Sequence, residues 1–217
     1  MKTYRAVIFD WDGTLMDSTQ HIVASLRGAC ADMNLPLPSV EEARWVIGLS
    51  IESALYRLVP DLTHAQMGVF AERYRDHFQR QDREQQLFPG QETLLRDLRR
   101  RGVILGVATG KSRRGLDRAL DALALREVFQ ATRCADEAAG KPDPAMLEQL
   151  LAEFGLAPFE AVMVGDTTHD VLMARHAGVD SLAVSYGAHP RQALGAAEPT
   201  ALVSSVRDMQ AWLRERT

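Results

Sequence analysis

The feature that most constrains this chain is the segment 7–14, VIFDWDGT, in which an apolar run ends at two carboxylates, a glycine and a hydroxyl. Tyr4 to Phe9 is a short stretch that is continuously apolar after Arg5, which is typical of a strand buried on both faces of a parallel sheet. The carboxyl end of such a strand opens into the crevice where open α/β sheets bind ligands. Because Asp10 and Asp12 are separated by one residue, an extended backbone points both carboxylates the same way. We therefore expect a polar site directly after this strand.

After this segment, helical periodicity continues through residues 16–87. One helix follows Asp17 and Ser18, either of which can cap it, and stops at the sequence NLPLP of residues 34–38. Three more helices are predicted: 40–47, a second one capped by Ser50, and a third that begins at the capping-box pair Thr63 and Gln66. The insert should end in a polar tail at 80–86 and a hinge at 88–90.

From Gln91 onward, helices and strands alternate, which is the signature of βαβ units around a parallel sheet. Strands are expected at 103–108, 128–132, 161–164, 181–185 and 201–203. Ser112 and Asp143 should cap two of the intervening helices, with Pro144 in the first helical position. The predicted fold is α/β: a Rossmann-like parallel sheet core (1–15 and 88–217) with helices on both faces, plus an inserted all-α helical cap (16–87).

Composition narrows the classes of function. The net charge of −4 includes no dense Lys/Arg block, so we expect no nucleic-acid or anionic-membrane partner. No apolar run approaches the roughly 20 residues of a membrane span, and the first strand begins too early to leave room for a signal peptide. Cys30 and Cys134 are isolated, so we expect buried thiols and neither zinc nor disulfides. A cytoplasmic protein is the resulting expectation.

Polar residues with complementary chemistry follow several predicted strands and should meet at one edge of the sheet. They are Asp10, Asp12, Thr109, Gly110, Lys141, Asp166 and Asp170. Carboxylates gathered in one crevice repel each other unless a cation is present, and an all-oxygen ligand set favours Mg²⁺. The lysine, the hydroxyl and backbone amides would complete a phosphate site.

Each of these residues taken singly has an ordinary explanation. Asp12-Gly13 alone is a common turn, although a helix and not a returning strand follows it. Thr109 could be a helix-start hydroxyl and Lys141 a solvated loop lysine. Asp166 and Asp170 could be helix-start acids that favour the macrodipole. The joint pattern, more than any member, supports the phosphate site.

Four segments in order resemble the motifs of the haloacid dehalogenase-like hydrolases: DWDGT at 10–14, Thr109 after an apolar strand, KPDP at 141–144, and Gly165-Asp166 followed by Asp170. The match extends from residue 4 to about residue 188. The helical insert, FPG at 88–90 and the stretch 174–178 are similar to the phosphoglycolate phosphatase-like branch. One departure is Gly110, where many phosphoglycolate phosphatases carry Asn.

The resemblance implies a role for each residue. Asp10 would be the nucleophile that forms an aspartyl-phosphate, and Asp12 the general acid and then the base. Thr109 and the Gly110 amide would bind phosphoryl oxygens, while Lys141 would neutralise charge and orient Asp10. Mg²⁺ would be held by Asp10, the main-chain carbonyl of Asp12 and Asp166, with Asp170 as a further ligand or a partner of one.

These roles favour a Mg²⁺-dependent phosphatase of a small phosphorylated metabolite, acting as a monomer or homodimer. A phosphomutase similar to β-phosphoglucomutase and a pyrophosphatase remain alternatives, as does a non-catalytic binding module on the same fold. Asp12 argues against a haloalkanoate dehalogenase or phosphonate hydrolase.

Within phosphatases the resemblance favours 2-phosphoglycolate, whose carboxylate needs a cation. The candidates are Arg44, Arg57, Lys111 and Arg113. Arg114 is a further candidate, although a solvated helix start explains Lys111, Arg113 and Arg114 equally well. The segment 48–50 could face the substrate because it separates two helices. His21, His169 and His176 are interpreted as surface or capping residues.

Overall fold

The computed structural model describes residues 2–80 and 86–217. The sheet contains β1 (Ala6–Phe9), β2 (Ile104–Thr109), β3 (Ala131–Cys134), β4 (Ala161–Gly165), β5 (Asp180–Val184) and β6 (Ala201–Val203). The α-helices are α1 (Thr19–Asp32), α2 (Val40–Trp45), α3 (Ile51–Leu58), α4 (His64–Arg80), α5 (Gln91–Arg100), α6 (Arg113–Ala122), α7 (Ala145–Phe154), α8 (Thr168–His176), α9 (Arg191–Ala196) and α10 (Val206–Arg216). Short 3-10 helices occupy Arg126–Val128 and Pro158–Glu160.

The six strands are all parallel, in the order β3-β2-β1-β4-β5-β6. This confirms the predicted Rossmann-like α/β fold. The direction of winding reverses between the central strands β1 and β4, and parallel α/β sheets bind ligands at such a switch point, beyond the carboxyl ends of the strands. The two strands therefore deliver their following residues, Asp10 and Asp166, to this crevice.

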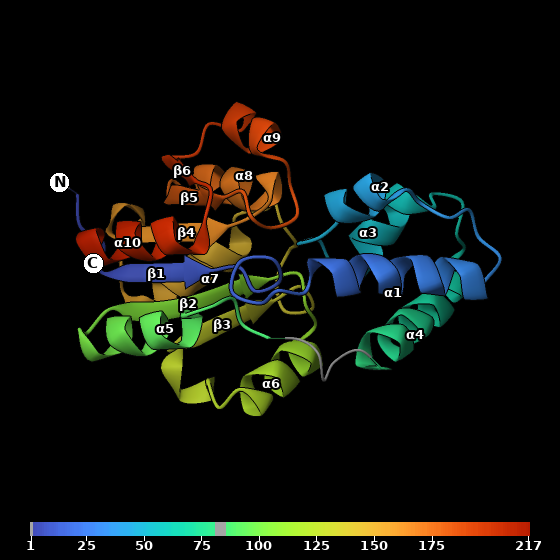
Figure 1. Cartoon of the computed structure of the whole chain (residues 1–217), viewed down its shortest axis with the longest axis horizontal. Coiled ribbons are helices and arrows are strands. Elements are labelled where there is room, and N and C mark those ends of the chain that lie inside the picture. The colour runs from blue at the N-terminus through green and yellow to red at the C-terminus, as the bar shows by residue number, and fades with distance from the viewer. Residues whose placement is uncertain (1, 81–85) are drawn as a thin grey trace.

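Side chains along β1 point alternately to the two faces of the sheet, and helices cover both faces (Figure 1). Val7 and Phe9 pack into a cluster with the leucines of α5 and α6, Met209 and Leu213 of α10. Ala6 and Ile8 face the opposite side, where they pack with α7 and α8. All four residues of the strand are buried, as predicted for a strand in the middle of a parallel sheet.

The helices α1 to α4, called here the inserted helices, lie together beyond the carboxyl edge of the sheet (Figure 1). Their buried side chains form a cluster of their own, which Ala188 joins from the loop after β5. The two connections to the sheet run side by side, since Met16 and Leu87 form an antiparallel bridge and Phe88 N donates to Leu15 O at 2.9 Å. The division at 1–15, 16–87 and 88–217 stays a prediction.

The predicted helix caps are largely confirmed. Ser50 and Ser112 accept hydrogen bonds from the backbone amides three residues later, and Thr63 and Gln66 bond reciprocally. Asp143 Oδ1 accepts from Ala145 N at 2.9 Å, but α7 begins after Pro144, one residue later than predicted. Ser18 precedes α1 without a capping hydrogen bond.

Other differences concern the edges of the sheet. The strand expected at 128–132 is β3 at Ala131–Cys134, because Val128 belongs to a 3-10 helix that packs it into the core. The helix α9 was not predicted. Residues 81–85, most of the expected polar tail, lie outside the described residues.

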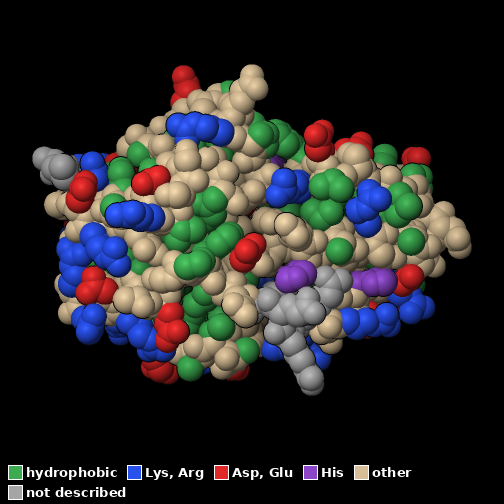
Figure 2. All heavy atoms as spheres, viewed as in Figure 1, with side chains coloured by type: hydrophobic (Ala, Val, Ile, Leu, Met, Phe, Trp, Pro, Cys, Tyr) green, Lys and Arg blue, Asp and Glu red, His purple; other side chains and the backbone are tan. Residues whose placement is uncertain are grey.

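On the face drawn in Figure 2, basic and acidic side chains are interspersed and do not form one large basic patch.

Among the helices within 2–80 and 86–217, none has the length and apolar character needed to cross a membrane. Cys30 and Cys134 are both buried free thiols, as expected.

Candidate active site

The carboxyl ends of β1 and β4 bring three buried acids together. Asp10 follows β1, Asp166 follows β4, and Asp170 lies in the first turn of α8. One oxygen from each of the three carboxylates lies within 4.8 Å of the others. Thr167 fixes Asp170 through a capping box, in which Asp170 Oδ2 accepts from Thr167 N at 3.0 Å and Thr167 Oγ1 at 2.7 Å.

Lys141 supplies the positive charge of this cluster. Its side chain is fully buried, and Nζ lies 2.7 Å from both Asp10 Oδ1 and Asp170 Oδ1. Burial alone would lower the pKa of Lys141, but the two carboxylates raise it above its ordinary value, so the ammonium stays charged. Burial raises the pKa of Asp10 well above its usual range; Lys141 opposes this shift, while Asp170 and Asp166 reinforce it.

Asp166 is held by two donors from distant parts of the chain. Thr14 Oγ1 donates to Oδ1 at 2.8 Å and Ala188 N to Oδ2 at 2.7 Å. Burial and then the charge of Asp170 raise the pKa of Asp166 to about 7. Gly13 has a positive φ of 78° and passes so close to this carboxylate that a Cβ would collide with it, which explains the glycine of the DWDGT segment.

The donor set fits a hard divalent cation. With all groups ionised, three carboxylates and one ammonium leave two uncompensated negative charges in a buried volume, which is costly without a counter-ion. Oxygen ligands without thiolate or imidazole are the set that Mg²⁺ prefers. The Asp12 side chain lies outside this group of three carboxylates.

Asp12 has partners different from those of Asp10. Its Oδ1 accepts from Ser18 Oγ at 2.7 Å, and its Oδ2 lies 2.9 Å from Lys111 Nζ. Lys111 also lies over the ring of Phe78 on α4, 4.7 Å from its centroid. The Asp12 carboxylate is thus oriented by the Ser18 hydroxyl and the Lys111 ammonium, and not by the groups that surround Asp10, Asp166 and Asp170.

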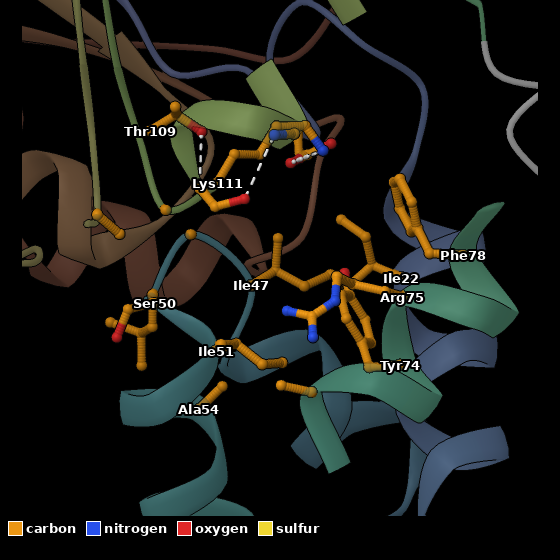
Figure 3. Close-up of a pocket in the computed structure, with 18 of the residues that line it drawn as sticks. Ile22, Ile47, Ser50, Ile51, Ala54, Tyr74, Arg75, Phe78, Thr109 and Lys111 are labelled. Atoms are coloured by element: carbon orange, nitrogen blue, oxygen red, sulfur yellow. Dashed lines mark hydrogen bonds and ion pairs between the residues drawn. The ribbon is translucent and has the colours of Figure 1, made fainter. Parts of the chain in front are cut away.

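A cavity of about 350 Å³ opens between this edge and the inserted helices. Asp10, Asp12, Thr109 and Gly110 line it from the core, and segment 48–50 lines it from the other side. Figure 3 shows Thr109 and Lys111 on one side and Ile51, Tyr74 and Arg75 on the other. The cavity therefore has a polar side, which carries Asp10 and Asp12, and a largely apolar opposite wall.

Gly110 allows the inserted helices to approach the core closely. A Cβ at this position would lie 2.5 Å from Gly48 O and would also collide with Leu49 O. The obstacles are backbone atoms, so no side-chain rotation would relieve them. Position 110, where many phosphoglycolate phosphatases carry Asn, is thus a glycine at a point where the backbone packs closely against the loop before α3.

Two histidines join the inserted helices to the core, which corrects the interpretation of His169 as a surface or capping residue. His169 and His189 are buried, and the Nε2 atom of each lies 3.1 Å from Trp45 O. Burial lowers the pKa of both rings, that of His189 to about 4. Thr168 N donates to His189 Nδ1, so the neutral ring donates through Nε2 to Trp45 O. Sequence reasoning missed His189, which follows no motif.

The candidate cations for a substrate carboxylate are distributed differently from expectation. Lys111 lines the cavity but pairs with Asp12. Arg113 pairs with Glu137 at 2.6 Å and does not line the cavity, nor do Arg44 and Arg57. Arg75 and Arg114 do line it. Arg75 was not singled out, because only the packing of α4 over the core shows that it faces the site.

Comparison with known proteins identifies the relatives of this architecture. A family model described as haloacid dehalogenase-like hydrolase matches residues 7–184. The chain is 33% identical over 208 residues to the probable phosphatase IndB of Dickeya dadantii, covering 94% of this chain and 90% of that protein. It is 34% identical to a phosphoglycolate phosphatase of Caulobacter vibrioides, covering 88% of this chain and 84% of the other.

Solved structures show the same arrangement of elements. A hydrolase from Pseudomonas syringae superposes with a TM-score of 0.89 at 25% identity, covering 97% of this chain and 98% of the other. The similarity therefore includes both the parallel sheet and the inserted helices.

Proposed function

Because the chain belongs to the haloacid dehalogenase-like hydrolases and is a phosphatase of that family, we propose that it hydrolyses a small phosphorylated metabolite with Mg²⁺ through an aspartyl-phosphate on Asp10. The observation that carries this proposal is the pairing of Asp10 Oδ1 with buried Lys141, while Asp10 Oδ2 is buried and accepts no hydrogen bond from any described residue. One oxygen is thus held by a cation, and the other is available to attack.

In the first step Asp10 Oδ2 forms a bond to phosphorus as the bond to the leaving oxygen breaks. Asp12 donates a proton to that oxygen, so the product leaves as an alcohol. Asp12 then takes a proton from water, the water oxygen attacks phosphorus, and the Asp10–phosphorus bond breaks to release phosphate. Splitting one displacement into two makes each step easier.

Other residues of the site bind or neutralise charge. Thr109 and Gly110 line the cavity, where the Thr109 hydroxyl and the Gly110 amide would donate to phosphoryl oxygens. Lys141 stabilises Asp10 as the anion. Asp10, Asp166 and the Asp12 carbonyl would hold Mg²⁺, with Asp170 in contact with the cluster, and the ion would neutralise charge that develops on the phosphoryl oxygens.

The test measures phosphate release from 2-phosphoglycolate, pyrophosphate, sugar phosphates and nucleoside monophosphates, with Mg²⁺ and with chelator. We expect a metal-dependent signal that Asp10→Asn abolishes while circular dichroism stays unchanged. Substantial turnover by Asp10→Asn would overturn the nucleophile assignment. Isomerisation of a sugar phosphate without phosphate release would favour the phosphomutase alternative instead.

A further inference from the structure

The cavity next to Asp10 is larger than a phosphate group requires. Ligand pockets of about 300–1,000 Å³ accommodate drug-sized molecules, and this one measures about 350 Å³. A two-carbon leaving group such as glycolate would leave much of that space filled by water. The size of the cavity therefore favours a larger leaving group.

The wall opposite the reactive carboxylates is apolar. Side chains from three of the inserted helices and the loop before α3 contribute to it, namely Ile22, Ile47, Leu49, Ile51, Tyr74 and Phe78. Burying an apolar or ring-shaped body against such a wall is favourable because it removes apolar surface from water. Figure 3 shows Ile47, Ile51 and Tyr74 arranged around the same space.

Four cations among the described residues line the cavity, namely Arg75, Lys111, Arg114 and Arg118, and of these Arg75 alone belongs to the inserted helices, where it is an exposed residue. Arg75 projects from α4 into the cavity, and its guanidinium points toward the side where Ile47 and Ile51 lie (Figure 3). Arg75 makes no hydrogen bond or ion pair with any residue in 2–80 or 86–217. A guanidinium carries one positive charge and a planar pair of donors that matches a carboxylate.

From this arrangement we propose that the substrate is the phosphomonoester of a hydroxy acid with an apolar or ring-shaped body, whose carboxylate is bound by Arg75. This inference rests on the proposed phosphatase function and deepens it. The phosphate occupies the Asp10 side, the body lies against the isoleucines and Tyr74, and the carboxylate ends at α4. Arg75 is a specificity-determining residue and takes no part in the chemical steps.

The experiment compares kcat/KM for phenyl phosphate, 4-carboxyphenyl phosphate and 2-phosphoglycolate. We expect 4-carboxyphenyl phosphate to exceed phenyl phosphate by about ten-fold, the value of one charge-assisted pair, and to exceed 2-phosphoglycolate as well. Arg75→Met should abolish the preference for the carboxylate and leave kcat/KM for phenyl phosphate unchanged. The ratio of kcat/KM for 4-carboxyphenyl phosphate to that for phenyl phosphate is compared between the wild type and Arg75→Met, because the difference in leaving-group acidity is the same in both enzymes and cancels.

Arg73→Met is the matched control, since Arg73 is exposed on the same helix but does not line the cavity. A preference that survives Arg75→Met, or one that Arg114→Met removes instead, would overturn the assignment of Arg75. A kcat/KM for 2-phosphoglycolate above that for 4-carboxyphenyl phosphate would overturn the inference that the leaving group is larger than glycolate. Failure of the phosphatase itself is distinguishable, because phenyl phosphate would then release no phosphate in any variant.

Discussion

Ser18 Oγ donates a 2.7 Å hydrogen bond to Asp12 Oδ1, so the residue that precedes the first inserted helix holds the proposed acid–base carboxylate. Both side chains are buried. The serine was predicted as a candidate helix cap, but its hydroxyl is directed at Asp12 and leaves the helix end without a side-chain cap. This contact links the start of the inserted helices directly to the chemistry.

Ser18→Ala should therefore lower kcat, and the fall should be larger than the loss of folding stability would explain. A hydrogen bond to a charged group contributes about 1.5–3 kcal/mol, so we expect kcat to fall by about ten-fold or more. Steady-state kinetics and thermal melting measure the two effects. Ser25→Ala is the control, because Ser25 is a buried serine within α1 whose hydroxyl donates to His21 O. Equal kcat values for the two variants would contradict the orienting role.

Lys141→Met should destabilise the protein strongly, because it leaves Asp10 and Asp170 facing each other without their shared cation. Removing one partner of a buried ion pair costs about 3–5 kcal/mol. Urea unfolding should show this loss for Lys141→Met, and a partial recovery when Asp10→Asn is added, since the second change removes one of the uncompensated charges. A double variant less stable than Lys141→Met would show that the charges are not the cause.

Much of the sheet and its reactive edge could be predicted because the signals are local. The segment 7–14 combines a buried strand with the residues that follow it, and strand alternation then places Asp10 and Asp166 at one edge. Errors arose where tertiary packing decided the outcome. Val128 has strand propensity, yet it closes the core from a 3-10 helix.

Contacts between the inserted helices and the core could not be predicted from spacing. Arg75 follows no motif, and it reaches the cavity only because α4 packs over the carboxyl edge. His189 lies in a loop without periodicity and becomes important through the stacking of its ring on Trp45, with centroids 4.3 Å apart. Such pairs depend on how two separately packed clusters meet.

Asp166→Asn should remove Mg²⁺ binding. The carboxylate oxygens of Asp10, Asp166 and Asp170 converge within 4.8 Å, so Mg²⁺ should bind the folded protein and raise its thermal midpoint; a ligand at a hundred times its Kd stabilises by about 2.7 kcal/mol. Differential scanning calorimetry with and without Mg²⁺ measures this directly, without substrate. Asp97→Asn on α5 is the control. A full Mg²⁺ shift in Asp166→Asn would place the ion elsewhere.

Gly110→Asn and Gly110→Ala should weaken catalysis by separating the inserted helices from the core. A Cβ at this position would lie 2.5 Å from Gly48 O, and because that obstacle is backbone, the segment 48–50 must move away from the cavity that it lines. Small displacements of groups that position a substrate can reduce rates by about a hundred-fold. We expect KM to rise and kcat to fall together, with circular dichroism unchanged. Gly140→Ala is the matched control, since a Cβ there meets nothing within 4 Å. If Gly110→Ala behaves like Gly140→Ala, the close approach of loop and core is not required for turnover.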